Sequence, residues 1–351
     1  QWHLHSFLMH KFISMTNIKQ IDTMNDENIL IVDNVSVSYT VDGKTNSILD
    51  SISFSIKQGE IVALVGESGC GKSITAQTIL RLLPYPYGEI TSGSVLFKKK
   101  DILKIPLSQL YTIRGKEIGI IFQDSFSALD PLLSVKKQIE EVYKIHCKSS
   151  MKKKDYKHAV IEILKTVGFI DPIQVMHAYP HELSGGMQQR VMIAIALAAS
   201  PSLLIADEPT TSLDIVTQMY IIQLLKEIQY EKNISVLFIT HDMHIVNKIA
   251  DSVVVMYAGQ VVESGKTDEV LAEPLHPYTR ALLEVMHPDI RTSKRFPVIT
   301  CISEMNLLQS DNFCRFLSRC SIAQDRCACE KPELIKKSNT HFVRCFYAGR
   351  K

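Results

Sequence analysis

Gly66-Glu67-Ser68-Gly69-Cys70-Gly71-Lys72-Ser73 matches the spacing G-x-x-x-x-G-K-[ST]. An apolar run at residues 61–65 precedes this turn, and a helix-like segment at residues 74–80 follows it. In that context the turn presents backbone N–H groups and a helix N-terminus to an anion. A chance glycine-rich turn is the alternative, and the order strand, turn, helix argues against it. The sequence therefore predicts a nucleotide phosphate site.

The turn also supplies side chains suited to a nucleotide and its metal ion. The Lys72 ammonium is expected to reach the β- and γ-phosphates, and the Ser73 hydroxyl is expected to ligate Mg²⁺. The predicted nucleotide-binding residues of this turn are Gly66, Ser68, Gly69, Gly71, Lys72, Ser73 and Ile74. What the protein does with the nucleotide must be inferred from the rest of the chain.

Composition sets limits on the class of protein. The 351 residues are 46% hydrophobic, which is enough for a substantial core, and the net charge is +2. This balance gives no electrostatic reason to expect nucleic acid as a partner. The longest apolar runs are shorter than the roughly 18–20 residues of a membrane helix. Any role at a membrane is therefore expected to be peripheral.

Residues 1–28 are expected to form a poorly ordered N-terminal extension. They have no clean apolar core followed by a small-residue cleavage site, so a signal peptide is rejected. Met24 directly precedes a polar stretch and strand-like sequence, which makes it a candidate start. Whether residues 1–23 belong to the native protein is left open.

Residues 29–64 are predicted to be β-structure, because short runs alternate between apolar and polar side chains around an Asp42-Gly43 turn. Tyr39 is the aromatic residue best placed to stack on an adenine ring. The alternative is a strand tyrosine packed on the sheet.

Gln123 follows the apolar run at residues 118–122. The carboxyl end of a parallel strand is where ligands bind in open α/β sheets, so Gln123 is expected to reach Mg²⁺ or the attacking water. The next segment, about residues 126–200, is predicted to be a helical insertion. Inserted subdomains of this kind often contact a partner.

A second glycine-rich turn, Leu183-Ser184-Gly185-Gly186-Met187-Gln188, begins a helix inside this insertion. A serine N-cap is common in any helix, which is the plain interpretation. Since one nucleotide needs only one phosphate-binding turn, the second turn is interpreted as serving a nucleotide held by another subunit.

Acidic residues and a histidine follow two further apolar strands. Asp207 and Glu208 end the strand at residues 203–206, and His241 ends the strand at residues 234–240. Asp207 is expected to hold Mg²⁺, and Glu208 to polarise the water that attacks the γ-phosphate. His241 is expected to contact the γ-phosphate, although a histidine buried for packing is the alternative.

Taken together, these motifs resemble the nucleotide-binding subunit of an ATP-binding cassette (ABC) transporter, over roughly residues 29–345. The matching motifs, in family order and spacing, are the first glycine-rich turn (Walker A), Gln123, residues 183–188, residues 204–208, residues 212–214 and His241. The resemblance implies an α/β fold: a P-loop NTPase core with an antiparallel β subdomain, an inserted helical subdomain and a C-terminal extension. It places the ATPase domain at residues 29–270 and the extension at residues 271–351.

The resemblance also implies roles for individual residues. Tyr39 corresponds to the adenine-stacking aromatic, Gln123 to the Q-loop, Glu208 to the catalytic base and His241 to the switch histidine. Two such domains would pack head to tail, each nucleotide lying between one Walker A turn and the partner's second glycine-rich turn (residues 183–188, the signature turn). The residues expected to bind the partner's nucleotide are Ser184, Gly185, Gly186 and Gln188.

The C-terminal part resembles one branch of the family. Residues 273–283 are similar to the stretch that closes the core in oligopeptide, dipeptide and nickel importers. Beyond them, the branch's cysteine pattern is matched by Cys314, Cys320, Cys327 and Cys345. Four thiolates suit an iron–sulfur cluster or a tetrahedral Zn²⁺. The resemblance implies a [4Fe-4S] cluster, and metal-free structural thiols are the alternative; Cys301 and Cys329 are expected not to be ligands.

The implied function is an ATPase that powers uptake of di- or oligopeptides, with ATP and Mg²⁺ as cofactors. The implied partners are a second ATPase subunit, favoured as a heterodimer, two transmembrane permeases and an extracytoplasmic substrate-binding protein. The protein would sit on the cytoplasmic face of the membrane. An ATPase of a nickel or metal-chelate importer is the near alternative. A non-transport ABC protein acting on ribosomes or DNA is remote, because this chain has neither two cassettes nor a long coiled-coil insertion.

Overall fold

The computed structural model of the protein describes residues 27–147, 152–211, 213–284 and 312–350. The predicted N-terminal extension, apart from Glu27 and Asn28, lies outside the described residues. Cys301 and Ser212 lie outside them as well.

The larger sheet of the described chain carries the candidate site. Its strands are β3 (Ile61–Val65), β6 (Ile118–Ile121), β7 (Leu203–Asp207), β8 (Ser235–Thr240), β9 (Ser252–Tyr257), β10 (Gln260–Lys266), β11 (Ile335–Lys336) and β12 (Phe342–Val343). They lie in the order β11-β12-β10-β9-β3-β8-β7-β6. The neighbours from β9 to β6 run parallel, and β10, β12 and β11 continue the sheet antiparallel. The carboxyl ends of β3, β6, β7 and β8 therefore share one edge.

The smaller sheet is antiparallel and matches the predicted β subdomain. Within the described chain it contains β1 (Asn28–Val41), β2 (Lys44–Lys57), β4 (Gly88–Phe97) and β5 (Lys100–Asp101), in the order β2-β1-β4-β5. Asp42 and Gly43 join β1 to β2 with positive φ angles of 51° and 73°. Glycine and aspartate tolerate this left-handed backbone better than most residues, which explains the turn.

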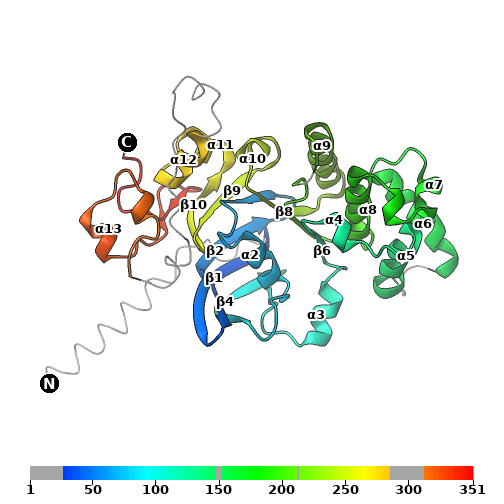
Figure 1. The fold of residues 1–351 in the computed structure, drawn as a ribbon, viewed down its shortest axis with the longest axis horizontal. Helices are drawn as coiled ribbons and strands as arrows, with labels where there is room; N and C mark the ends of the chain where they lie inside the picture. The colour runs from blue at the N-terminus through cyan, green and yellow to red at the C-terminus, as the bar shows by residue number, and fades with distance from the viewer. Residues whose placement is uncertain (1–26, 148–151, 212, 285–311, 351) are drawn as a thin grey trace.

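The helices fall into groups on either side of the larger sheet's central strands. The described α-helices are α2 (Lys72–Ile79), α3 (Leu107–Ile113), α4 (Ser125–Ala128), α5 (Val135–His146), α6 (Tyr156–Thr166), α7 (Pro172–His177), α8 (Gly185–Leu197), α9 (Ile215–Lys232), α10 (Met243–Ile249), α11 (Thr267–Ala272), α12 (Pro277–Glu284) and α13 (Asp325–Cys329). Three short 3₁₀ turns are also described: η1 (Lys153–Asp155), η2 (Pro180–Glu182) and η5 (Leu317–Arg319). Helices α4 to α8 lie between β6 and β7 in sequence and gather at one end of the molecule, opposite α13 (Figure 1). The predicted fold class is confirmed.

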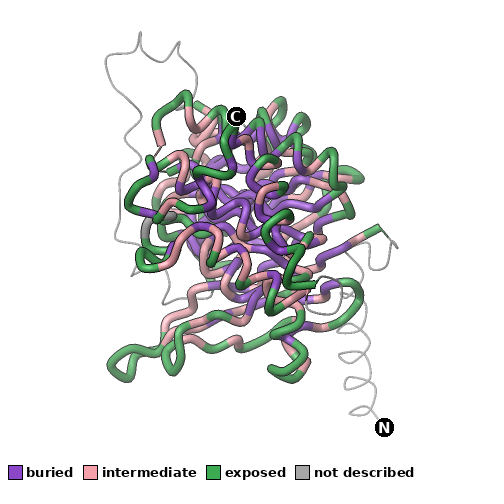
Figure 2. The backbone as a smooth tube through the Cα atoms, turned by 90° about the vertical axis from the view of Figure 1, so that its right-hand side faces the viewer, coloured by how far each residue is buried: buried purple, intermediate pink, exposed green. Residues whose placement is uncertain are grey.

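The core follows the parallel strands. Every residue of β3, β7 and β8 is buried, because both faces of the parallel strands are covered. The smaller sheet and α2 pack on one face, and helices including α9 and α10 pack on the other. Buried positions concentrate in the middle of the molecule, and exposed positions lie at turns and outer helix faces (Figure 2). The strands whose ends carry the candidate site are therefore part of the closely packed core.

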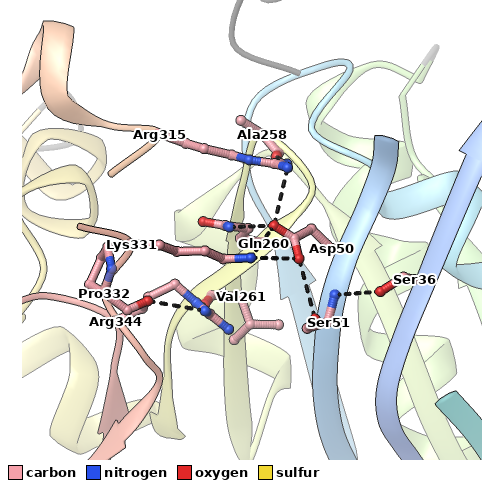
Figure 3. Close-up of polar contacts among 10 residues, drawn as sticks. All are labelled: Ser36, Asp50, Ser51, Ala258, Gln260, Val261, Arg315, Lys331, Pro332 and Arg344. Carbon is pink, nitrogen blue, oxygen red and sulfur yellow. Dashed lines mark hydrogen bonds and ion pairs between the residues drawn. The ribbon is translucent and has the colours of Figure 1, made fainter. Parts of the chain in front are cut away.

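Residues 312–350, here called the C-terminal segment, are integrated into the core. Strand β12 pairs with β10 and thereby extends the larger sheet. Asp50 of β2 accepts hydrogen bonds from Lys331 Nζ at 2.6 Å and Gln260 Nε2 at 2.7 Å, and Arg315 Nη2 lies 3.1 Å from the same carboxylate (Figure 3). Nearby, the buried Arg344 donates to the carbonyl of Val261. This charge network ties the C-terminal segment to both sheets.

Burial of Asp50 raises the pKa of its carboxyl group, but its surroundings oppose that effect. Hydrogen bonds from Lys331 and Gln260, together with the charge of Arg315, outweigh burial and leave the pKa of Asp50 below its ordinary value. Asp50 is therefore held as a carboxylate in the folded protein.

Candidate functional site

The Walker A turn connects β3 to α2 and depends on glycine. Gly71 is the N-cap of α2 and has a φ of 107°, a left-handed conformation that side chains rarely adopt. A Cβ atom at Gly71 would lie 2.6 Å from Leu49 Cδ2, so the packing also excludes a larger residue. Ser68 and Gly69 are exposed at the tip of the turn. The turn thus has the shape and accessibility that its sequence predicts for a phosphate cradle.

Lys72 points back over this turn. Its side chain is 4% exposed, and Nζ donates to the carbonyl oxygens of Gly66 and Glu67, each at 2.9 Å. The same Nζ lies 3.8 Å from Glu208 Oε1. The ammonium is therefore fixed between the turn and the end of β7, where it can meet a phosphate group.

Ser73 and Asp207 bring a hydroxyl and a carboxylate together next to the turn. Ser73 Oγ donates to Asp207 Oδ1 at 3.0 Å. Burial raises the pKa of Asp207, the charge of Glu208 adds to this rise, and Ser73 and Lys72 oppose it. Oxygen ligands of these two kinds suit Mg²⁺. A divalent cation here would favour the carboxylate, which the protein alone disfavours.

The predicted residues Gln123 and His241 both lie next to Glu208. Its Oε2 accepts from Gln123 Nε2 at 3.1 Å and from Thr211 Oγ1 at 2.8 Å, and it lies 3.5 Å from His241 Nδ1. Glu208 itself has a positive φ of 46°, which is uncommon for a residue with a side chain and often marks a functional site. His241 is 57% exposed, so its placement does not fit a histidine buried for packing. The Glu208 carboxylate therefore has three polar neighbours: Gln123, Thr211 and His241.

Tyr39 lies in β1 with its ring half-buried against the β subdomain. Its hydroxyl is buried and has no hydrogen-bond partner among the described residues, and burial raises its pKa. Both interpretations of this tyrosine, adenine stacking and sheet packing, therefore stay predictions.

The signature turn is separate from the chain's own Walker A turn. Helix α8 begins at Gly185, well away from α2 and near the helical end of the molecule (Figure 1). Ser184 is the N-cap and accepts from the Met187 N–H at 3.4 Å. Ser184 and Gly185 are exposed. The fold therefore separates this group of predicted nucleotide ligands from the chain's own Walker A turn.

Gln188 takes part in holding that turn. It is buried, and its Nε2 donates to the carbonyl oxygens of Pro180 at 2.8 Å and Leu183 at 3.4 Å. Its amide nitrogen is therefore engaged within the same chain. Its predicted contact with a partner's nucleotide stays a prediction.

The four predicted cysteine ligands lie around one small cavity in the C-terminal segment. Cys314, Cys320, Cys327 and Cys345 line it together with Phe316. Burial raises the pKa of Cys314 to about 12, and the three other thiols add to the rise. Among the described residues, no group of three or more His, Cys, Asp or Glu side chains is arranged to hold a metal ion. The structure thus brings the four cysteines together without showing a zinc or iron–sulfur site.

Three contacts of the site were not predicted from the sequence. Thr211 donates to Glu208, and a hydroxyl three residues after a strand-end carboxylate is a local signal that could have revealed it. Tyr278 and Arg319 contact Glu67 in the Walker A turn. No local pattern predicts these two contacts, since the partners are 211 and 252 residues apart in the chain.

Comparisons with known proteins agree with this geometry. Residues 49–211 match the family model "ABC transporter", and residues 262–327 match "Oligopeptide/dipeptide transporter, C-terminal region". The chain is 44% identical over 307 residues to the oligopeptide transport ATP-binding protein AppD of Bacillus subtilis, covering 85% of this chain and 90% of AppD. It is 39% identical over 326 residues to the dipeptide transport ATP-binding protein DppD of Escherichia coli, covering 92% and 98%.

Solved structures give the same picture. A dimeric post-hydrolysis state of the ATP-binding cassette MJ0796, bound to ADP and Pi, has a TM-score of 0.61 and 30% identity, covering 68% of this chain and 98% of that one. The chain belongs to the ATP-binding proteins of ABC transporters and is an ATPase of that type. Within them it belongs to the family of oligopeptide and dipeptide transport ATP-binding proteins, which confirms the resemblance that its motifs indicated.

Proposed function

We propose that this protein is the ATP-hydrolysing subunit of an importer that takes up di- or oligopeptides. The observation that carries the proposal is the joint presence of an assembled hydrolysis site around Glu208 and a C-terminal region of the oligopeptide/dipeptide type. The names of the relatives AppD and DppD support peptides over nickel or metal chelates as the transported molecules.

The reaction is hydrolysis of ATP to ADP and phosphate. Water attacks the γ-phosphorus, the bond to the β,γ-bridging oxygen breaks, and ADP leaves. Glu208 Oε2, next to Gln123 and Thr211, is the proposed acceptor of the water proton. His241 is proposed to steady that water and the γ-phosphate, and Lys72 to hold the phosphates.

The Mg²⁺ that accompanies ATP fits the Ser73 hydroxyl and the Asp207 carboxylate, with Gln123 as the third proposed ligand. When bound, this ion neutralises charge on the β- and γ-phosphates. Ser73 and Asp207 are already within hydrogen-bond distance of each other, so they need little rearrangement to share a cation.

A second ATPase subunit completes the site in this proposal. Ser184 and Gly185 are exposed at the start of α8, a helix that lies apart from α2 in Figure 1. A head-to-tail partner would place them, with Gly186, on its nucleotide, and the MJ0796 cassette is itself described as dimeric. We favour a heterodimer of two different ATPase subunits.

The remaining proposed partners are two membrane permeases and an extracytoplasmic substrate-binding protein, without nucleic acid. No helix in the described ranges is long and apolar enough to cross a membrane. The proposed location is peripheral, on the cytoplasmic face of the membrane, with the helical subdomain in contact with the permeases.

We further propose that Cys314, Cys320, Cys327 and Cys345 hold a [4Fe-4S] cluster, with Zn²⁺ as the alternative. The support is the small cavity that all four line. Burial raises the pKa of Cys314, Cys320 and Cys345, so their thiolate forms need a nearby cation. A bound metal would stabilise the thiolates. Cys329 is exposed and does not line the cavity.

Anaerobic purification followed by iron, sulfide and zinc analysis tests the cysteine site. The variant Cys320→Ser should lower the metal content, and Cys329→Ser should leave it unchanged as a matched control. Iron with sulfide would support the cluster, and zinc alone would replace it by the alternative. Absence of all three would leave structural thiols.

Uptake by the assembled transporter tests the proposed function. The complete importer, with this subunit or its Glu208→Gln variant, would be placed in vesicles and supplied with labelled dipeptide, tetrapeptide or Ni²⁺. ATP-dependent uptake of peptide, lost in Glu208→Gln, is the expected result. Uptake of nickel without peptide would overturn the assignment to peptides.

A further inference from the structure

Glu67, the second residue of the Walker A turn, forms an ion pair with Arg319 of the C-terminal segment. Arg319 Nη1 donates to Glu67 Oε2 at 2.8 Å, and Arg319 Nη2 donates to Glu67 Oε1 at 2.7 Å. The arginine side chain is 5% exposed and the glutamate side chain 30%. A two-pronged arginine–carboxylate contact fixes orientation as well as distance, so it defines where this part of the turn lies.

The backbone of Glu67 is held as firmly as its side chain. The Glu67 N–H donates to the hydroxyl of the fully buried Tyr278 at 2.9 Å, and the Glu67 carbonyl accepts from Lys72 Nζ at 2.9 Å. The same Lys72 donates to the carbonyl of Gly66. The position of the Glu67 peptide therefore determines where the ammonium of Lys72 is held.

Tyr278 and Arg319, which bind Glu67, are themselves held by neighbouring side chains. The ring of Tyr278 packs on Tyr257 of β9 and on Phe316, with ring centroids 4.8 Å and 5.5 Å away. Arg319 Nη1 also lies 3.3 Å from the hydroxyl of Tyr257. Strand, helix α12 and C-terminal segment thus meet behind the turn in one packed aromatic cluster.

We propose that Arg319 and Tyr278 are positioning residues for ATP binding, acting through Glu67 on the phosphate-binding turn. They touch neither substrate nor reacting atoms. They hold the turn and Lys72 in the geometry that receives the phosphates, and this makes the C-terminal segment part of the nucleotide site. The competing interpretation is that the contact only fastens the C-terminal segment to the core, in which case stability would change and ATP affinity would not.

The test compares Arg319→Met, Arg319→Lys and Tyr278→Phe in the full-length protein. Titration calorimetry with a non-hydrolysable ATP analogue should show the dissociation constant raised about tenfold in Arg319→Met, a coupling of ordinary size. Arg319→Lys should recover part of the affinity, because lysine keeps the positive charge but cannot form both hydrogen bonds to the Glu67 carboxylate. In phosphate-release assays KM should rise while kcat changes less than about twofold, the signature of lost binding.

Arg326→Met is the matched control. Arg326 is an exposed arginine of the same segment, and its described partners, Glu330 and the ring of Phe346, both belong to the C-terminal segment. Its removal should leave the affinity unchanged. Should Arg319→Met not fold, Tyr278→Phe removes one hydroxyl and leaves the ring packing in place, so it still reports on the turn.

The double variant Glu67→Gln/Arg319→Met, compared with each single variant, shows whether the two residues act on ATP affinity through their shared contact or by disturbing the fold independently. Its affinity should be no weaker than that of the weaker single variant, because both changes break the same contact. A wild-type dissociation constant in folded Arg319→Met and Tyr278→Phe, with only the melting temperature lowered, would overturn the proposal in favour of simple fastening.

Discussion

Gln123 Nε2 lies 3.1 Å from Glu208 Oε2, although 85 residues separate them in the sequence. Their strands explain the contact, because β6 and β7 are parallel neighbours in which Ile121 pairs with Ala206. The loop that leads from β6 into the helical insertion therefore contacts the proposed catalytic base directly. Gln123 thus lies between the helical insertion, which begins at about residue 126, and Glu208.

Replacing Gln123 with alanine removes this contact and one proposed Mg²⁺ ligand. We expect kcat to fall about 10- to 100-fold, in the range of losing one preorganised donor. Phosphate release by the purified protein and by the transporter complex is the measurement. Activity equal to the wild type in both would show that the contact has no part in hydrolysis.

Glu208→Gln keeps the size of the side chain but cannot take up a proton. Hydrolysis should fall by about 10²- to 10⁴-fold, the usual worth of a general base, while ATP still binds. ATP-bound dimers should then accumulate and be visible by size-exclusion chromatography. Undiminished turnover would remove Glu208 from the proposed role.

Thr211→Val tests the contact that the sequence did not predict. The variant keeps the shape of the side chain and loses the hydroxyl that donates to Glu208 at 2.8 Å. Because that bond orients the carboxylate, kcat should fall about three- to tenfold, as for the loss of roughly 1 kcal/mol. Thr211→Ser retains the donor and should behave like the wild type; equal losses in both variants would point to packing instead.

Asp50→Asn should destabilise the protein in a pH-dependent way. The change leaves Arg315 and Lys331 without their buried carboxylate, at a cost of about 3–5 kcal/mol in unfolding free energy at neutral pH. Since the folded-state pKa of Asp50 lies below its ordinary value of 3.8, its contribution is present above that pH and is lost as the pH falls through the folded-state pKa.

Urea unfolding at pH 7, 5 and 3.5 measures this effect. The difference between the wild type and Asp50→Asn should be full at pH 7 and 5 and begin to shrink at the lowest pH. Asp42→Asn, on the exposed β1–β2 turn, serves as the control and should have little effect at any pH. A difference that stays constant down to pH 3.5 would argue for lost packing.

The sequence predicted those parts of the site that local chemistry determines. The Walker A turn is contiguous, and Gln123, Asp207, Glu208 and His241 each follow an apolar strand whose carboxyl end faces the same edge of the sheet. Placing them together required only the expectation that those strands are parallel and close. The fold class could be predicted on the same grounds.

Other contacts could not be predicted because no local pattern carries them. Asp50 and Lys331 are 281 residues apart, and nothing near either one identifies its partner. Gln188 is a further case, since its place in a motif predicts a nucleotide ligand but not the hydrogen bonds that its amide makes to Pro180 and Leu183. Side-chain partners within a packed core depend on tertiary geometry, which a motif does not record.

The pairing of β12 with β10 has a consequence for how this gene tolerates change. A chain that stopped before residue 312 would retain all the nucleotide-site motifs, from the Walker A turn to His241. It would nevertheless lose an edge of its main sheet, the counter-ions of Asp50 and the arginine that faces Glu67. Late stop codons and shortened expression clones should therefore behave as loss-of-function alleles, so the last forty residues cannot be trimmed as an accessory tail.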